Sequence, residues 1–147
     1  MAAARPMPKD YRMVLDTDLG RSLATLNGAG KYREAIQVGG RIQRSVDWFP
    51  KVSYEMGYAH YRLGEFDAAV RNYDAALTRN PTLTTALYDR GEIHLDQGRL
   101  DAARADFDLV VEHNPSHWAG HFRLAHLSGK DEDAESFERH LMNAIQF

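Results

Sequence analysis

A repeat of 34 residues is the feature that most restricts how this chain can fold. When the sequence is shifted by 34 positions, residues 57–81 align with residues 91–115, and nine of the 25 aligned positions are identical. The identical pairs are Gly57/Gly91, His60/His94, Gly64/Gly98, Asp67/Asp101, Ala68/Ala102, Ala69/Ala103, Asp74/Asp108, Asn80/Asn114 and Pro81/Pro115. One such unit cannot bury its apolar face alone, so neighbouring units must stack. The period therefore predicts a repeat architecture.

Each unit has the pattern of two helices joined by a turn. Phe66, Ala69 and Tyr73 follow helical spacing in the second half of the first unit. Gly64 stands where the first helix has to end in a left-handed residue. Pro81 stops the second helix, because proline disfavours helical geometry in the residue before it. Gly57 lies where two helices would cross closely.

Weaker units flank the two strong ones. Residues 30–36 align with residues 64–70, again 34 positions apart, and an apolar stripe before them predicts a helix from near Asp10 to Asn27. In the second helix of this unit, Gly39 and Gly40 replace the expected aromatic residue. After the strong units, residues 118–127 predict another first helix. The final helix carries an apolar face, for which we expect burial, opposite a polar face that suits a solvent-facing cap. Its apolar residues are Ala134, Phe137, Leu141, Ala144 and Ile145.

The small, aromatic and proline positions of the units follow one pattern. In the first strong unit they are Gly57, His60, Ala69, Tyr73, Ala76 and Pro81, and in the next they are Gly91, His94, Ala103, Phe107, Val110 and Pro115. At these residues the sequence resembles the tetratricopeptide-repeat (TPR) family. The resemblance implies an all-α, right-handed solenoid of antiparallel helix pairs, with about three repeats and a C-terminal capping helix pair. The expected segments are an N-terminal extension (1–15), a divergent repeat (16–49), two repeats (50–83 and 84–117) and the capping pair (118–147).

The resemblance also implies a binding groove, since TPR ligands commonly lie against the first helix of each repeat. The residues expected on that face are Lys51, Tyr54, Tyr58, Tyr61 and Arg62 in one repeat, Tyr88 and Glu92 in the next, and Phe122, Arg123 and His126 in the last pair. Tyrosines at positions 54, 61 and 88 are common in the family for packing reasons. Tyr58 stands at a position that is usually polar. It is therefore the main candidate for an anchor that contacts a partner.

Composition limits the class of partner. The formal charge is −3, from 18 basic and 21 acidic residues that intermix along the chain, so we expect no nucleic acid partner. Apolar runs are too short for membrane insertion, and residues 1–9 lack the apolar stretch of a secretory signal. The absence of cysteine excludes disulfides and thiolate metal sites and is compatible with the reducing cytoplasm, where we expect the protein.

Motifs for chemistry are incomplete. His117 and His121 have the spacing of two metal ligands, but a site normally needs three or four, so we interpret them as incidental surface residues and expect no metal. The glycines after Asn27 lack the rest of a phosphate-binding loop. The sequence from Asp16 to Asp18 begins like a calcium loop but does not continue as one. We also expect no other cofactor.

A carboxylate clamp of the kind that binds chaperone tails is not expected. The resemblance places its asparagine and basic positions at Ala24, Glu55 and Asp89. Two of these residues are acidic and would repel a carboxylate.

The predicted function is a non-catalytic scaffold or adaptor that binds a peptide or helix of a partner protein in the groove. Two alternatives remain open: a secretion-type chaperone for a dedicated client, and an assembly protein that self-associates through its terminal repeats. A monomer or a weak homo-oligomer is expected. An enzyme is the weakest hypothesis, because no nucleophile has a convergent base.

Overall fold

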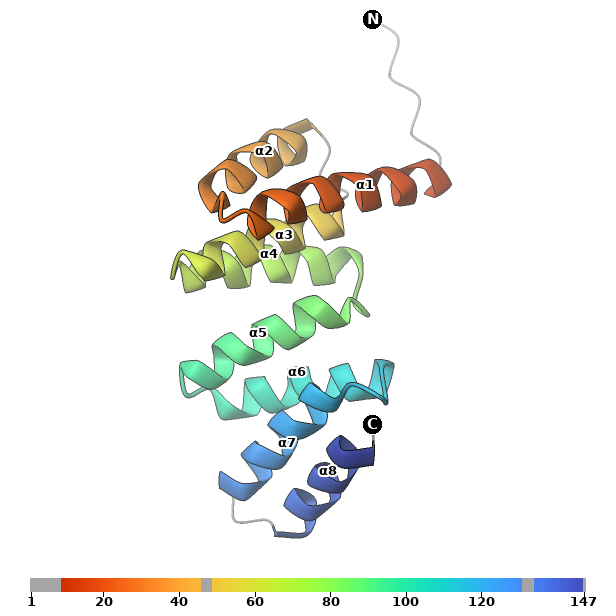
Figure 1. Ribbon diagram of the computed structural model, residues 1–147, viewed down its shortest axis with the longest axis vertical. Coiled ribbons are helices and arrows are strands. Elements are labelled where there is room, and N and C mark those ends of the chain that lie inside the picture. Colours follow the sequence, from red (N-terminus) through yellow and green to blue (C-terminus); the bar gives the residue numbers. More distant parts are fainter. Residues whose placement is uncertain (1–8, 46–48, 131–133, 147) are drawn as a thin grey trace, which may run out of the picture. The chain divides into compact units, whose positions relative to one another are not determined.

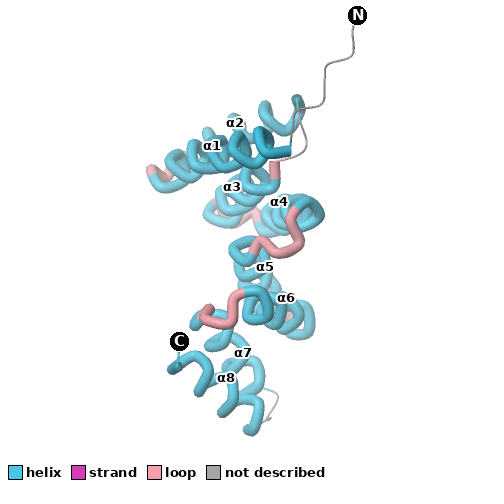
Figure 2. Tube along the Cα trace, turned by 90° about the vertical axis from the view of Figure 1, so that its right-hand side faces the viewer, coloured by secondary structure: helices cyan, strands magenta, loops and turns pink. Residues whose placement is uncertain are grey.

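The fold is all-helical wherever the computed structural model describes the chain, which is residues 9–45, 49–130 and 134–146. In these residues the chain forms eight α-helices and no strand (Figure 1; Figure 2). They are α1 (Lys9–Gly28), α2 (Tyr32–Ser45), α3 (Pro50–Arg62), α4 (Phe66–Arg79), α5 (Thr84–Asp96), α6 (Leu100–His113), α7 (Trp118–Lys130) and α8 (Ala134–Gln146). The predicted fold class is confirmed. Within the same residues, no helix is long and apolar enough to cross a membrane.

The contacts divide the chain into two compact units, Met1–Pro81 and Thr82–Phe147. In the first unit, α3 packs against α4 and also against both α1 and α2. In the second unit, α5 packs against α6, α6 against α7, and α7 against α8. In each unit, the second helix of one repeat therefore packs against the first helix of the next repeat: α2 against α3, and α6 against α7.

The turns inside the repeats share one geometry, which depends on glycine. Gly30, Gly64 and Gly98 have φ values of 75°, 76° and 75°, a left-handed conformation that costs glycine little. After Gly64, the backbone N–H of Glu65 donates to the carbonyl oxygen of His60 at 2.9 Å. This bond satisfies a carbonyl at the end of the helix and fixes the angle at which the chain enters α4. The left-handed residue predicted at Gly64 is confirmed.

The helix crossings in the two strong repeats place glycine against an aromatic ring. A Cβ atom added to Gly57 would lie 2.7 Å from Cε1 of Tyr73, and one added to Gly91 would lie 2.9 Å from Cε1 of Phe107. Both rings are fully buried. Because the glycines have no side chain, the two helices of a repeat approach closely enough to enclose each ring.

In the first repeat, the large residue at this crossing lies on the first helix and the glycine on the second, the reverse of the later repeats. The positions that match Gly57 and Tyr73 are Leu23 in α1 and Gly39 in α2. Leu23 is fully buried, and a Cβ on Gly39 would lie 3.3 Å from its Cδ1 atom and 2.5 Å from Cγ of Met56. The missing aromatic residue is thus replaced by side chains from α1 and α3. This exchange explains how a divergent repeat keeps a filled core.

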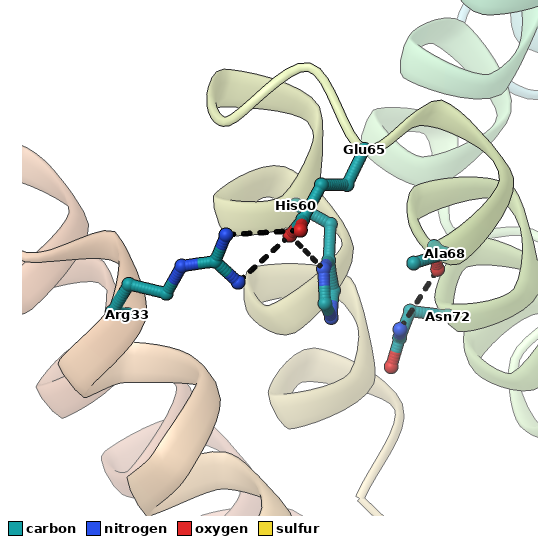
Figure 3. A network of polar contacts seen from close by, with 5 residues as sticks. All are labelled: Arg33, His60, Glu65, Ala68 and Asn72. Atoms are coloured by element: carbon teal, nitrogen blue, oxygen red, sulfur yellow. Dashed lines mark hydrogen bonds and ion pairs between the residues drawn. The ribbon is translucent and has the colours of Figure 1, made fainter.

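One buried polar pair of the second unit has no counterpart in the preceding repeat. In the second unit, Arg90 of α5 donates to both carboxylate oxygens of Asp106 on α6, at 2.9 and 2.6 Å, and Asp106 is almost completely buried. The matching positions in the preceding repeat hold Met56 and Asn72. The amide of Asn72 instead donates to the carbonyl oxygen of Ala68, one turn earlier in α4 (Figure 3).

The final helix departs from the prediction. Ile145 was expected on the buried face of α8, but it is 69% exposed, and Met142 on the same helix is also exposed. Leu141 and Ala144 are half-buried, whereas the side chains of Ala134 and Phe137 lie outside the described residues. The outer surface of α8 is therefore more apolar than a solvent-facing cap requires.

Candidate functional site

Tyr58 and Arg62 form the centre of the predicted binding face on α3. Tyr58 is half-buried and Arg62 is exposed. The Arg62 Nη1 atom donates a hydrogen bond to the Tyr58 hydroxyl at 3.3 Å, and its guanidinium lies 5.5 Å from the ring centroid of Tyr32. The four-residue spacing of Tyr58 and Arg62 on one helix permits this bond. Together these three residues form what we call the tyrosine–arginine patch.

Tyr32 was not identified from the sequence. It lies at the start of α2, where the helical pattern gave it no role beyond its place in the repeat. Its contact with the end of α3 depends on the packing of α2 against α3, so no local signal marks it. A cation placed over a tyrosine ring is stabilised electrostatically, by about 0.5–1 kcal/mol at exposed sites.

Lys51 is occupied by contacts at the start of α3. Its ammonium donates to the Thr17 hydroxyl of α1 at 2.8 Å, and its backbone N–H donates to the Asp16 carboxylate at 3.0 Å. Asp16 therefore caps α3 from another helix, since the residue at the N-cap of α3 itself makes no side-chain cap. Burial raises the pKa of Asp16 even though the hydrogen bonds from Lys51 and Val52 act in the opposite direction.

Tyr54 and Tyr61 are packing residues in the structure. The Tyr54 ring lies 5.7 Å from the buried ring of Tyr73, and the Tyr61 ring lies 5.8 Å from that of Phe66. Both tyrosines are half-buried. Both rings pack α3 against α4. Tyr58 differs from them because it stands at a position that is usually polar in the family.

In the second unit, three of the predicted groove residues bind one another. Arg123 of α7 donates to both carboxylate oxygens of Glu92 on α5, at 2.5 and 3.0 Å. Tyr88 lies beside this pair, with its ring 5.6 Å from Phe107 and 5.2 Å from His117. Burial raises the pKa of the Tyr88 hydroxyl. These charges stabilise the contact between α5 and α7, so they are less accessible to a partner than the sequence suggested.

The other two predicted residues of α7 are exposed. Phe122 is 48% exposed, and His126 is also exposed. Trp118, one turn before Phe122, is 62% exposed and was missed as a candidate, because the sequence placed it only at the start of a helix. Exposed aromatic side chains at this spacing share one face of the helix.

Glu55, one of the two acidic residues that argue against a carboxylate clamp, is engaged inside the first unit. The amide nitrogen of Asn27 on α1 donates to the Glu55 carboxylate of α3 at 2.8 Å and to the Glu55 backbone carbonyl at 3.0 Å. These bonds hold α1 against α3. Glu55 thus has a structural role on the face where the clamp would bind a carboxylate.

The interpretation of His117 and His121 as incidental surface residues was wrong. His121 is buried, and its Nε2 atom lies 2.8 Å from the backbone oxygen of Pro115. When Nε2 carries the proton, it donates a hydrogen bond to that oxygen. His117 caps α7, since its Nδ1 atom accepts a hydrogen bond from the backbone N–H of Gly120 at 2.9 Å. Spacing alone could not distinguish these structural roles from exposure. Over the described part of the chain, no group of three or more possible ligands is arranged to hold a metal.

A network of charges connects the first two repeats. Arg33 of α2 donates to both carboxylate oxygens of Glu65, at 3.0 and 2.9 Å, and Nδ1 of His60 lies 3.0 Å from the same carboxylate (Figure 3). The hydrogen bonds from Arg33, and then that from His60, lower the pKa of Glu65. The histidine at the family's aromatic position therefore fixes the turn between α3 and α4.

Comparison with solved structures shows the same fold in several proteins. The structure described as MamA superposes with a TM-score of 0.81 at 18% identity, covering 92% of this chain and 83% of that one. YrrB, described as a TPR protein with an unusual peptide-binding site, gives 0.72 at 21% identity, covering 89% and 68%. The first TPR domain of Spaghetti (RPAP3), bound to an HSP90 peptide, gives 0.71 at 23% identity, covering 78% and 91%. At sequence identities this low, the comparison shows that these proteins share the fold.

Sequence comparison identifies the family. No match was found among curated proteins. A sequence profile of the tetratricopeptide repeat matches residues 54–117 and, in overlapping register, residues 88–139. The two matches cover more than half of the chain, and they include the repeats whose glycine turns and glycine–aromatic crossings are described above. The chain belongs to the tetratricopeptide-repeat family.

Proposed function

We propose that the protein is a non-catalytic interaction scaffold, and that a peptide or helix of a partner protein binds to the tyrosine–arginine patch on α3. The observation that carries this proposal is the pairing of a half-buried tyrosine with an exposed arginine on the helix face that the family uses for ligands. The repeat core does not need Tyr58, since Tyr73 and Tyr54 already fill the crossing with α4. The cysteine-free sequence favours a reducing compartment such as the cytoplasm.

The chemistry of the patch indicates what such a partner presents. The rings of Tyr32 and Tyr58 offer apolar surface at a small cost in side-chain entropy. Arg62 uses one of its donors on Tyr58 and keeps the rest of a rigid, planar set that suits carbonyl or carboxylate oxygens. The partner segment therefore combines an apolar side chain with a hydrogen-bond acceptor close to it.

The ligand of one structural neighbour does not transfer to this chain. The RPAP3 domain is bound to the HSP90 peptide SRMEEVD, whose last residue is an aspartate. In this chain the positions expected for a carboxylate clamp hold Ala24, Glu55 and Asp89, and Glu55 is bonded to Asn27. A terminal carboxylate would meet negative charge there, so we expect recognition centred on Arg62.

A displayed peptide library selected on the full chain tests the proposal. The affinity of a recovered peptide is measured by calorimetry for the wild type and for Tyr58→Ala and Tyr58→Phe. Loss of the ring in Tyr58→Ala should cost about 2 kcal/mol of binding, as for a central aromatic anchor. Tyr58→Phe keeps the ring, removes only the bond to Arg62, and should cost less.

Tyr73→Ala is the matched control, because it removes a tyrosine ring from the core of the same repeat. It should lower the thermal stability markedly, whereas Tyr58→Ala should change it little. Wild-type affinity in Tyr58→Ala, or a melt as poor as that of Tyr73→Ala, would exclude Tyr58 as an anchor.

A further inference from the structure

A cavity of about 410 Å³ lies at the start of α3, where residues of α1, α3 and the end of α4 line it. Its lining includes Asp16 and Thr17 of α1, Lys51 of α3 and Arg79 of α4, all of which belong to the first unit. Ligand pockets have volumes of about 300–1,000 Å³. The cavity is therefore large enough to hold a side chain of a bound peptide. We call it the lysine cavity.

The ammonium of Lys51 has a neutral partner in this cavity. It donates to the Thr17 hydroxyl at 2.8 Å, and that hydroxyl donates in turn to the Met13 carbonyl oxygen at 3.0 Å. Among the residues that the structure describes, the ammonium forms no ion pair with a carboxylate. Since an ammonium has three donors, Lys51 keeps two of them for a ligand.

The acidic residue of the cavity, Asp16, is engaged by backbone. Its carboxylate is almost completely buried and accepts from the backbone N–H of Lys51 at 3.0 Å. The N-terminus of α3 is thereby capped, so an anion in the cavity has to be bound by side chains. Arg79 adds a second basic side chain to the lining. The lining therefore carries two positive charges against one negative charge.

The first unit as a whole has the same charge bias. Residues 1–81 contain 12 basic and nine acidic residues, whereas residues 82–147 contain six basic and 12 acidic residues. The negative formal charge of the chain therefore comes from the second unit. A positively charged unit attracts acidic segments of a partner and repels basic ones.

Lys51 lies on the same face of α3 as the tyrosine–arginine patch. Seven residues separate Lys51 from Tyr58, which places them within about 20° of each other around the helix and about 10 Å apart along its axis. Arg62 continues this row one turn later. A segment that binds to Tyr58 and Arg62 can therefore extend along α3 to the lysine cavity.

We infer that the lysine cavity binds an aspartate or glutamate side chain of the same partner segment that contacts the tyrosine–arginine patch. This inference rests on the proposed function and adds an acidic residue to the partner segment. An extended chain advances about 3.3 Å per residue, so the acidic residue stands about three positions from the apolar residue that contacts Tyr58. Lys51 donates to its carboxylate, and such a charge-assisted hydrogen bond is stronger than one to a neutral hydroxyl.

Two segments of the chain itself are alternative occupants. Residues 1–8, which precede α1, contain no acidic residue, so they offer no carboxylate to Lys51. Asp47 precedes Lys51 by four positions and lies outside the described residues. The variant Asp47→Asn therefore belongs in the test.

Peptides selected on the full chain from a random displayed library test the inference. The recovered sequences are first compared for an acidic residue at a constant spacing from an apolar one. One such peptide is synthesised in two forms, with the acidic residue and with the corresponding amide. Calorimetry then measures the affinity of both peptides for the wild type and for each variant.

A double-mutant cycle isolates the contribution of Lys51. On the wild type, the amide peptide should bind about tenfold more weakly than the acidic peptide, as for the loss of a hydrogen bond between charged groups. Lys51→Met removes the charge and keeps an unbranched side chain, so the two peptides should differ by less than about twofold on this variant. Lys51→Arg keeps the charge and should restore most of the difference.

Arg71→Met is the matched control. Arg71 is an exposed basic residue of α4 that does not line the cavity, so this variant lowers the charge of the first unit by the same amount. It should retain the tenfold difference. Thermal melts followed by circular dichroism establish that each variant is folded. Salt provides a second measurement on the wild type alone, since the acidic peptide should lose more affinity than the amide peptide as the salt concentration rises.

Three results would overturn the inference. The first is a set of peptides that require Tyr58 but have no acidic residue at a constant spacing. The second is an acid–amide difference that is as large in Lys51→Met as in the wild type. The third is a difference that appears only in Asp47→Asn, which would assign the cavity to Asp47. If Tyr58→Ala instead binds like the wild type while the difference still depends on Lys51, the tyrosine anchor fails and the carboxylate site is supported.

Discussion

Two glycine-to-alanine substitutions in the first unit test the packing account directly. A Cβ added to Gly57 of α3 would lie 2.7 Å from Cε1 of Tyr73 and 3.2 Å from the backbone oxygen of Ala69. The ring is fully buried and the second atom is backbone, so neither can move easily. A Cβ added to Gly40 of α2 would meet nothing within 4 Å. Both glycines therefore lie in helices, but only Gly40 has room for an added methyl group.

The magnitudes follow from two terms. Alanine is favoured over glycine inside a helix by about 1 kcal/mol, and this term applies to both variants. Overpacking costs about 1–3 kcal/mol and applies only to Gly57→Ala. Gly40→Ala should thus raise the free energy of unfolding by up to about 1 kcal/mol. Gly57→Ala should be less stable than Gly40→Ala by about 1–3 kcal/mol, because the propensity term cancels in the comparison.

Urea denaturation followed by far-UV circular dichroism measures this difference. A background of Trp118→Phe leaves Trp48 as a fluorescent probe in the first unit, so the two units can be followed separately if they unfold at different urea concentrations. Equal midpoints for the two variants, or a more stable Gly57→Ala, would refute the assignment of Gly57 to a close helix crossing.

Three further predictions concern polar groups. Arg90→Met should destabilise the second unit by about 3 kcal/mol because it leaves the Asp106 carboxylate buried without its guanidinium; adding Asp106→Asn recreates the Met56/Asn72 combination of the preceding repeat and should recover most of the loss in a thermal melt. Asp16→Ala should lower the free energy of unfolding by about 1 kcal/mol because α3 loses its cap, whereas Asp16→Asn can still cap and should lower it less. Urea titrations of the two variants measure this difference. Burial lowers the pKa of His140, with Asp108 opposing this effect and Arg139, His121 and Arg104 adding to it. The folded state then binds fewer protons than the unfolded chain, so stability should fall as the pH drops below about 6.5, and urea midpoints at several pH values should show a weaker decrease in His140→Gln.

The local features of the fold could be predicted from the sequence because their causes are local. The left-handed turns depend on Gly30, Gly64 and Gly98, and the ends of the second helices depend on asparagine–proline pairs. The helical period then gives the remaining boundaries to within a few residues. These signals recur every 34 residues, so each repeat supports the interpretation of the others.

Features that depend on two distant residues could not be predicted in the same way. The substitution of Leu23 and Gly39 for a glycine and an aromatic residue is visible only when both helices are compared. Glu92 and Arg123 were each placed on the groove, but their mutual ion pair removes much of their availability. Ile145 is 69% exposed, and the helical pattern alone does not show whether another element covers an apolar face.

The most direct test of the central claim is a photo-crosslinking measurement at Tyr58. A photoreactive phenylalanine analogue replaces Tyr58 in one protein and Tyr11 in another, because Tyr11 is an exposed tyrosine of α1 remote in sequence from the patch. Each protein is irradiated with a peptide selected on the wild type, and the crosslinked residues are mapped by mass spectrometry. The account predicts a strong crosslink from position 58, a weak one from position 11, and competition by unlabelled peptide. Equal crosslinking from both positions, or none from position 58, would contradict the assignment of the tyrosine–arginine patch as the binding site.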